Sequence, residues 1–273
     1  MSRVARILGV VAVAVGVPSL AAAASLAAPA GHANLSQVIL RASLVPSTTY
    51  EPAVGQTRAC PKNMAHVGKS CVDKFEGSLV EIKDNGTEVP FSAYENPAGH
   101  HVRAVSRSGV APQGHISMYQ AKAACSASGK RLCHAGEWMN ACKGPEHTKF
   151  PYGNERQANA CVDTNRTSPT LKLYYGERSP RTMNDPRLNQ MANTVEPTGA
   201  AAACTNGYGV RDMVGNVHEW TDDASFRGGY YLDTHMNGDG CDYRTTAHAP
   251  NYYDYSTGFR CCADEGSLGE DAD

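Results

Sequence analysis

The chain has 273 residues, a formal net charge of −2 and a pI of about 6.5. This near-neutral balance, with no basic stripe along the sequence, excludes nucleic acid as an expected partner. Roughly 200 residues between Arg58 and Ala263 are enough for one domain with a substantial core.

The first 33 residues have the pattern of a secretory signal peptide. Arg3 and Arg6 precede the apolar run ILGVVAVAVGV, and small residues near Ala24 and Ala33 suit cleavage. A single membrane anchor is the alternative, but Pro18 and the alanine-rich stretch disfavour a span of about twenty residues. No later segment is apolar enough to cross a bilayer. We therefore expect an exported protein, secreted or periplasmic, with no stable membrane span.

After this segment, the pattern predicts a linker and then one domain with two helices. Residues 34–56 show no periodicity and are interpreted as the linker, and the domain is expected over residues 57–264. The stretch ISMYQAKAACSASGKRLC predicts a helix that Ser117 caps and that Gly129 ends in a left-handed conformation. A shorter helix is expected from His134 to Cys142.

Elsewhere glycine, proline, asparagine and aspartate interrupt the chain every few residues. Only short strands such as FRGGYYL and TGFRCC fit between these breaks. The expected fold class is α+β with an unusually large share of irregular loop, which cross-links or bound ions would have to stabilise. The acidic tail, residues 265–273, is expected to be disordered.

All ten cysteines follow the predicted signal peptide. An even number in an exported chain predicts disulfides, and the absence of any C-x-x-C argues against zinc ribbons and thioredoxin-type redox motifs. If GFRCC is a strand, Cys261 and Cys262 point to opposite faces and must meet different partners. Cys60 and Cys71 are candidates for a local loop, and the remaining pairing is open.

Five motifs occur in one order: GKRLCHAGEWMNAC, FPYGNE, GVRDMVGNVHEWTDD, FRGGYY and STGFRCC. Together they resemble the formylglycine-generating enzyme (sulfatase-modifying factor) family. The resemblance begins at AHVGKSCVDKFEG, residues 65–77, and covers nearly all of the predicted domain. It implies a loop-rich mixed fold related to C-type lectins.

The stretch VRDMVGNVHEWTDD suits a calcium loop. Calcium takes six to eight oxygen ligands from carboxylates and from backbone carbonyls in irregular structure. Asp212 and Glu219 supply carboxylates, and the break at Gly215-Asn216 frees carbonyls. The resemblance implies that calcium binds through the side chains of Asp212 and Glu219 and the carbonyls of Gly215 and Val217. The alternative is an ordinary turn that leads into a strand.

Other metal sites have weaker support. The family has a second calcium site after FPYGNE, for which Asn159 and Asp163 are loosely aligned candidates. The histidines, which a non-haem iron site would use, show no ligand spacing such as H-E-x-x-H and are interpreted as surface or core residues. They are His100, His101, His115, His134, His218, His235 and His248.

The catalytic chemistry of the family meets an obstacle in this chain. The resemblance implies oxidation of a substrate cysteine to formylglycine by dioxygen at copper(I) held by two thiolates, which suit this soft ion. Cys241 fits the second family cysteine, but Met236 lies five residues upstream, and an alignment from the glycine pair puts Asp233 in the first cysteine's place. Met236 either ligates copper weakly or merely packs. Cys241 is expected in a disulfide, with Cys142, Cys261 or Cys262 as its partner.

Two functions from different classes follow. The favoured one is an exported binding or structural module, in which calcium and disulfides fix long loops around a peptide- or glycan-sized groove. The tyrosines of NYYDYSTG would form an aromatic wall for this ligand or cover a core edge. The alternative is an oxidase of the formylglycine-generating type that uses a metal at Cys241. The sequence specifies no oligomeric state.

Overall fold

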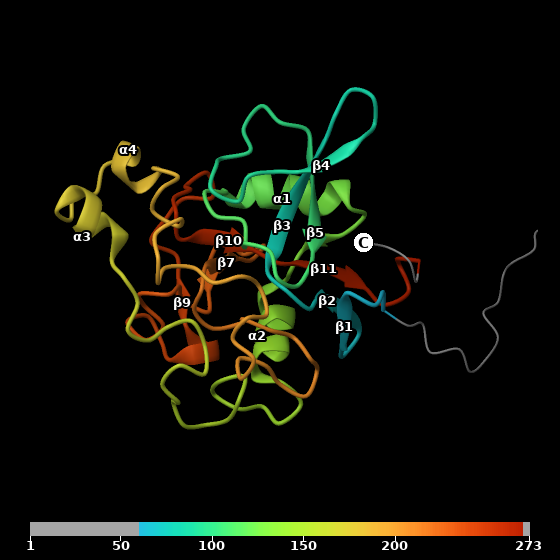
Figure 1. Ribbon diagram of the computed structural model, residues 1–273. Coiled ribbons are helices and arrows are strands. Elements are labelled where there is room, and N and C mark those ends of the chain that lie inside the picture. Colours follow the sequence, from blue (N-terminus) through green and yellow to red (C-terminus); the bar gives the residue numbers. More distant parts are fainter. Residues whose placement is uncertain (1–59, 270–273) are drawn as a thin grey trace, which may run out of the picture. The chain divides into compact units, whose positions relative to one another are not determined.

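Figure 1 shows the computed structural model of the chain, which describes residues 60–269. The predicted signal peptide, residues 1–33, and the predicted linker, residues 34–56, lie outside the described residues. Short helices and strands alternate with long irregular segments, so the predicted α+β class is confirmed.

Three small sheets form the framework. The first has the order β1 (Met64–Val67), β2 (Ser70–Asp73), β11 (Cys261–Asp264) and β6 (Arg131–Leu132). The second has the order β10 (Thr257–Phe259), β7 (His218–Trp220), β8 (Phe226–Arg227) and β9 (Arg244–Thr245). The third has the order β4 (Glu88–Pro90), β3 (Gly77–Ile82) and β5 (Val102–Ser106). Only β10 and β7 pair in parallel; all other paired strands of these sheets are antiparallel.

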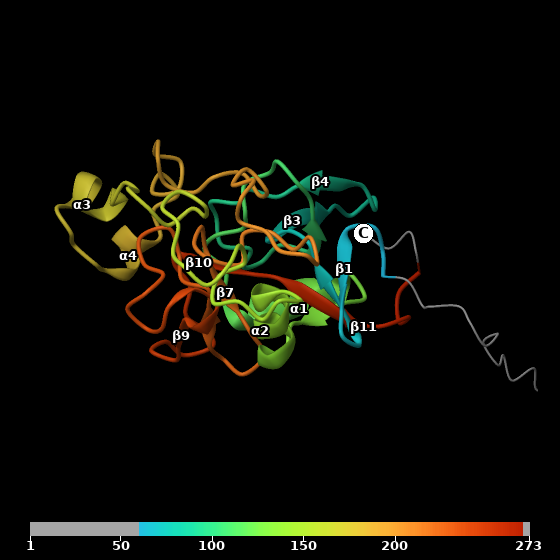
Figure 2. The same ribbon diagram turned by 90° about the horizontal axis from the view of Figure 1, so that it is seen from below.

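Both predicted helices are present. Helix α1 (Met118–Ala127) begins at a capping box in which Ser117 and Gln120 exchange side-chain bonds with each other's backbone, and Gly129 has the expected positive φ. Helix α2 is Ala135–Lys143. The shorter helices are α3 (Pro169–Tyr174), α4 (Pro180–Met183) and the 3₁₀ turn η1 (Gly240–Asp242). In both views α3 and α4 lie next to each other at the edge of the domain (Figures 1 and 2).

The two predicted strands differ from the observed ones. The stretch TGFRCC forms β10 in the second sheet and β11 in the first, with Arg260 between them. In FRGGYYL only Phe226 and Arg227 are in a strand, so this prediction was too long. Gly228 and Gly229 both have positive φ, and a Cβ at either would clash with a backbone carbonyl. The chain therefore turns at these glycines and cannot continue β8.

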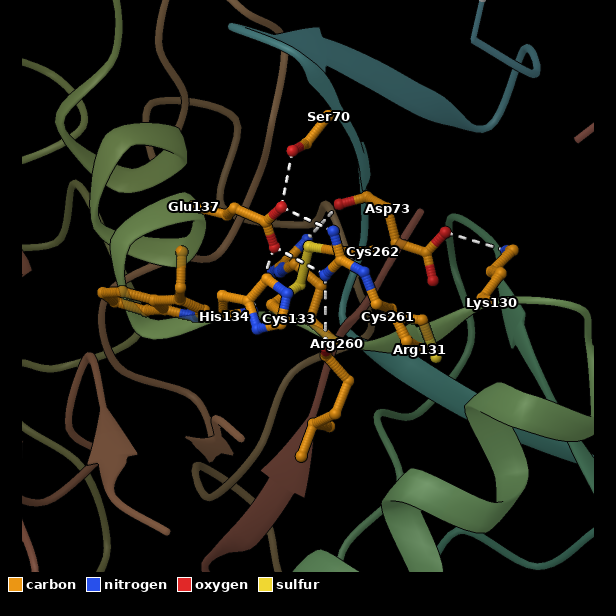
Figure 3. The surroundings of a disulfide bond; sticks show 12 residues. Ser70, Asp73, Lys130, Arg131, Cys133, His134, Glu137, Arg260, Cys261 and Cys262 are labelled. Carbon is orange, nitrogen blue, oxygen red and sulfur yellow. Dashed lines mark hydrogen bonds and ion pairs between the residues drawn. A yellow bond between two sulfur atoms is a disulfide. The ribbon is translucent and has the colours of Figure 1, made fainter. Parts of the chain in front are cut away.

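Five disulfides connect all ten cysteines. The predicted local loop Cys60–Cys71 is confirmed, and the adjacent cysteines of β11 do meet different partners. Cys261 binds Cys125 of α1, and Cys262 binds Cys133 just before α2 (Figure 3). Each bond lies in a different hydrophobic cluster, so the two disulfides fasten β11 to α1 on one side and to the segment between β6 and α2 on the other.

The predicted tail begins within the described residues. The Glu265 amide donates to the Lys69 carbonyl, and Leu268 packs at the edge of a small cluster with Met64 and Cys71. Residues 270–273 lie outside the described part of the chain.

Candidate functional site

Cys241 lies on η1 and forms a disulfide with Cys142 of α2. Both residues are fully buried. Met236 is 78% exposed. The expectation that this side chain merely packs is therefore not met in the interior. Asp233 accepts hydrogen bonds from the amides of His235 and Met236 and from the Tyr243 hydroxyl. In the alignment from the glycine pair, an anchored carboxylate therefore stands in the first cysteine's place, and Cys241, which fits the second, is in a disulfide.

The loop between Val210 and Glu219 departs from regular backbone where the sequence predicted a break. Asp212, Gly215 and Asn216 have φ values of 58°, 81° and 56°. A Cβ at Gly215 would clash with the Val162 carbonyl, so only glycine fits there. The turn brings Asp212 and Glu219 into one buried cluster of charged side chains.

That cluster combines three carboxylates with one guanidinium. Arg260 donates two bonds to Glu219, at 2.7 and 3.0 Å, and the Trp138 indole adds a third at 2.6 Å. Glu76, which lies near the start of the domain, accepts a hydrogen bond from the Asn216 side chain at 2.7 Å. Glu76, Asp212, Glu219 and Arg260 are all buried. Because three acids face one base, the cluster has an excess of negative charge.

The excess charge is visible in the pKa values of two of the acids. Burial and, to a smaller extent, the nearby charge of Glu219 raise the pKa of Asp212 to about 6. Burial also raises the pKa of Glu76, and the charges of Asp212 and Glu219 add to this effect. Added positive charge would therefore stabilise the ionised cluster.

The negative charge of the cluster suits a cation, and one carboxylate oxygen is free to bind it. Asp212 uses one carboxylate oxygen to accept the Gly199 amide at 2.6 Å, while its other oxygen is buried with no partner among residues 60–269. Glu219 accepts one bond at Oε1 and so keeps a lone pair there. Within the same described range, no cluster of three or more histidine, cysteine, aspartate or glutamate side chains suits a metal. A cation here would therefore depend on backbone carbonyls, as the prediction with Gly215 and Val217 requires.

Of the two candidates for a second calcium site, Asp163 already has several partners. Asp163 accepts from Arg156 at 2.6 Å, from Thr234 at 3.0 Å and from Thr164 at 2.9 Å. Asn159 lies exposed on a left-handed turn. The Asp163 carboxylate is therefore balanced by a guanidinium that the motif alone did not indicate.

Several aromatic side chains surround His218 on the second sheet. Its ring stacks on Phe226 at 4.9 Å and on Tyr230 at 4.8 Å between ring centroids, and Nε2 lies 3.3 Å from the Tyr243 hydroxyl. The tyrosines of NYYDYSTG divide between surface and core. Tyr253 is 38% exposed and Tyr252 stacks on His248, whereas Tyr255 is buried. Tyr255 therefore covers part of the core, while Tyr253 remains at the surface.

His115 gives the domain a measurable sensitivity to acid. It is buried, its Nδ1 contacts the Asn184 side chain at 3.2 Å, and its Nε2 has no partner among the described residues. Burial lowers the pKa of His115 below its ordinary 6.5, although Asn184 and the charges of Asp254, Asp185 and Glu95 oppose this shift. The unfolded chain therefore binds a proton more readily than the folded one, and stability falls as pH drops below about 6.5.

We expect the stability difference between wild type and His115→Gln to change in favour of the variant between pH 7 and pH 5, because glutamine does not titrate. Urea unfolding at a series of pH values measures this difference. The exposed variant His101→Gln serves as the control. A pH-independent difference for His115→Gln would contradict the prediction.

Comparisons with known proteins agree with the fold and the motifs. The family described as sulfatase-modifying factor enzyme 1-like domain matches residues 20–265, which is more than half of the chain. This loop-rich, disulfide-linked α+β domain therefore belongs to the sulfatase-modifying factor, or formylglycine-generating enzyme, family. The family resemblance carried by the five motifs is therefore confirmed.

Individual relatives match only in part. The inactive C-alpha-formylglycine-generating enzyme 2 of Bos taurus is 31% identical over 168 residues, which cover 57% of this chain and 51% of the relative. The formylglycine-generating enzyme of Mus musculus is 32% identical over 114 residues, covering 41% of this chain and 27% of the relative. This chain thus spans about half or less of these relatives. Among solved structures, the major tropism determinant U1 variant has a TM-score of 0.41 and 13% identity over 75% of this chain and 53% of that one.

No helix among the described residues is long and apolar enough to span a membrane.

Proposed function

We propose that this chain is an exported binding or structural module of the family that does not use copper dithiolate chemistry. The bond between Cys241 and Cys142 carries the proposal, because a disulfide sulfur supplies no thiolate for copper. Five disulfides in one domain also suit an oxidising compartment outside the cytosol. The Bos taurus relative is named an inactive C-alpha-formylglycine-generating enzyme 2, which supports a role without this activity.

The experiment is peptide mapping of the unreduced protein after a thiol-specific label, together with copper(I) titration. We expect no labelled cysteine, a linked peptide pair with Cys142 and Cys241, and no stoichiometric copper. Cys142→Ser is the matched control, because it frees the Cys241 thiol without touching the other four bonds. A labelled Cys241 with one copper(I) per chain in the wild type would support the oxidase alternative.

Calcium is the second part of the proposal. The side chains of Asp212 and Glu219 would hold it with the carbonyls of Gly215 and Val217. The excess negative charge of the cluster and the unpartnered Asp212 oxygen support this assignment. A bound calcium would fix the loop that connects Asp212 to β7.

We expect calcium to raise the melting temperature of the wild type, because a ligand bound only by the folded state stabilises it by about 2.7 kcal/mol at one hundred times its Kd. Asp212→Ala should abolish this response. Asp84→Ala, at an exposed turn, should retain it. Melting followed by circular dichroism in calcium and in chelator measures the effect. A wild type indifferent to both would rule out the calcium site while leaving the disulfide part of the proposal intact.

The ligand would contact the aromatic face formed by Tyr252, Tyr253 and His248. Tyrosine rings combine apolar area with a polar hydroxyl, which suits either a peptide or a glycan. His248 is exposed and lies 3.8 Å from Tyr252 between ring centroids. The face therefore presents a stacked pair of rings to solvent.

A further inference from the structure

The segment Ser168–Met183, here called the α3–α4 finger, presents an unusual pair of apolar side chains. Leu171 is 61% exposed and Tyr175 is 94% exposed. Leu171 lies on α3, and Tyr175 is the residue that directly follows this helix. In Figures 1 and 2 this helix lies at the edge of the domain, away from the three sheets.

The other side of the finger is anchored to the domain. Pro169 and Thr170 are buried, and Leu173, Tyr174 and Met183 pack against a cluster that includes Leu188, Tyr231 and Tyr255. The finger is therefore held in place by its inner side. Leu171 and Tyr175 remain outside because the inner positions are already filled.

Tyr175 also has an uncommon backbone conformation. Its φ of 53° and ψ of 28° are left-handed, which few aromatic residues adopt. Gly176 follows directly and also has a positive φ, of 86°. No hydrogen bond or ring contact among residues 60–269 holds the Tyr175 side chain. The left-handed residue ends α3, because the amides of Tyr175 and Gly176 donate to the carbonyls of Leu171 and Thr170. The ring itself is left open to solvent.

The finger is positively charged, unlike the chain as a whole. It contains Lys172, Arg178 and Arg181 but a single acid, Glu177, whereas the net charge of the whole chain is −2. All three cations are exposed, and none forms an ion pair within the described part of the chain. Cations that border an exposed apolar pair suit a partner with negative charge at its surface and apolar material below it.

We propose that the finger docks on membranes that contain anionic phospholipids. Leu171 would enter the boundary of the acyl chains, and the Tyr175 ring would sit at the headgroup level, where tyrosine is favoured. The three cations would contact lipid phosphates. A bilayer fits this convex tip better than a protein surface does, because a specific protein interface needs about 800 Å² per partner and the finger offers a few side chains.

An introduced indole tests the proposal directly. Both native tryptophans, Trp138 and Trp220, are buried, so Tyr175→Trp in the full chain adds the only exposed indole of the described domain. With vesicles of phosphatidylcholine and phosphatidylglycerol at 3:1 and low salt, we expect a blue-shifted emission and quenching by brominated lipid. Pure phosphatidylcholine should give neither. High salt should reduce the response, because it screens exposed charges.

Two controls separate the finger from general adsorption. Tyr119 on α1 is 59% exposed, and Tyr119→Trp should give no shift with the same vesicles. Reversing the three finger cations to glutamate in the Tyr175→Trp background should weaken the response by at least about tenfold. The single reversal Lys122→Glu, also on α1, should leave it unchanged.

An unshifted indole at position 175 with anionic vesicles would overturn the proposal. An equal shift on neutral vesicles would overturn it as well, because the cations would then have no part in binding. Circular dichroism melts of each variant show that a lost response does not come from a lost fold. The cysteine and calcium experiments are independent of this result.

Discussion

Replacing Arg260 by methionine is expected to lower the free energy of unfolding by about 3–5 kcal/mol. The guanidinium is fully buried and donates to both oxygens of Glu219 and to the carbonyls of Asp73 and Arg211. Methionine fills a similar volume but supplies no charge and no donor. It leaves the Glu219 carboxylate buried and unpaired beside the acids Glu76 and Asp212. Urea unfolding with the disulfides intact measures the loss.

The expected loss of stability depends on the burial of the Arg260 guanidinium. An ion pair at the surface tests this dependence. Arg187 also pairs with an aspartate, Asp185, but its side chain is largely exposed. Arg187→Met should cost less than about 1 kcal/mol. Adding Glu219→Gln to Arg260→Met should recover part of the loss, because the uncompensated charge is then removed. If Arg260→Met folds too weakly to measure, Arg260→Lys should give an intermediate loss. Equal losses at positions 260 and 187 would contradict the argument.

Local sequence signals predicted the helices well. Ser117 and Gln120 stand three residues apart before an apolar helical pattern, and both bonds of the expected cap are present. Such features act over a single turn, so a sequence shows both partners at once. The opposite partners of Cys261 and Cys262 were predictable for the same reason, since they follow from the alternation of side chains along a strand.

The break at Arg260 was not predictable from local pattern. The apolar run GFRCC looks like one strand, but β10 and β11 belong to different sheets. What separates them is the buried arginine, whose partners Asp73 and Glu219 lie 187 and 41 residues away. Pairings over such distances leave no periodicity in the sequence. A buried arginine in an apolar run is the one local hint that a carboxylate lies nearby.

The sequence singled out two of the three acids of the buried cluster and missed the third. The family resemblance singled out Asp212 and Glu219, and the structure does place them in one cluster. Glu76 was missed, although it lies in the stretch KFEG that marked the start of the resemblance. Its contact with Asn216 joins residues 140 positions apart. Only the three-dimensional arrangement shows that three acids share one arginine.

Removal of the Cys133–Cys262 bond should destabilise the domain more than removal of a disulfide that closes a short loop. We expect Cys133→Ala with Cys262→Ala to lose about 4–5 kcal/mol, because the bond closes a loop of 129 residues and restricts the unfolded chain strongly. Removing Cys60–Cys71, whose loop spans 11 residues, should cost about 3 kcal/mol on the same account. Thermal and urea unfolding of the two double variants measure the difference.

Polar contacts near the Cys133–Cys262 bond also hold this part of the domain together. Beside Cys133–Cys262, Glu137 joins Ser70 and Arg131 through hydrogen bonds at 2.5–2.7 Å, and Lys130 binds Asp73 at 2.8 Å (Figure 3). These polar contacts connect β2, β6 and α2 without any sulfur, so the folded arrangement should survive the double variant. The loss would then arise mainly in the unfolded state. Removing Cys125–Cys261, with a separation of 136 residues, should cost as much as removing Cys133–Cys262. Equal losses for the long loops and the short one would show that local packing around each bond outweighs loop closure.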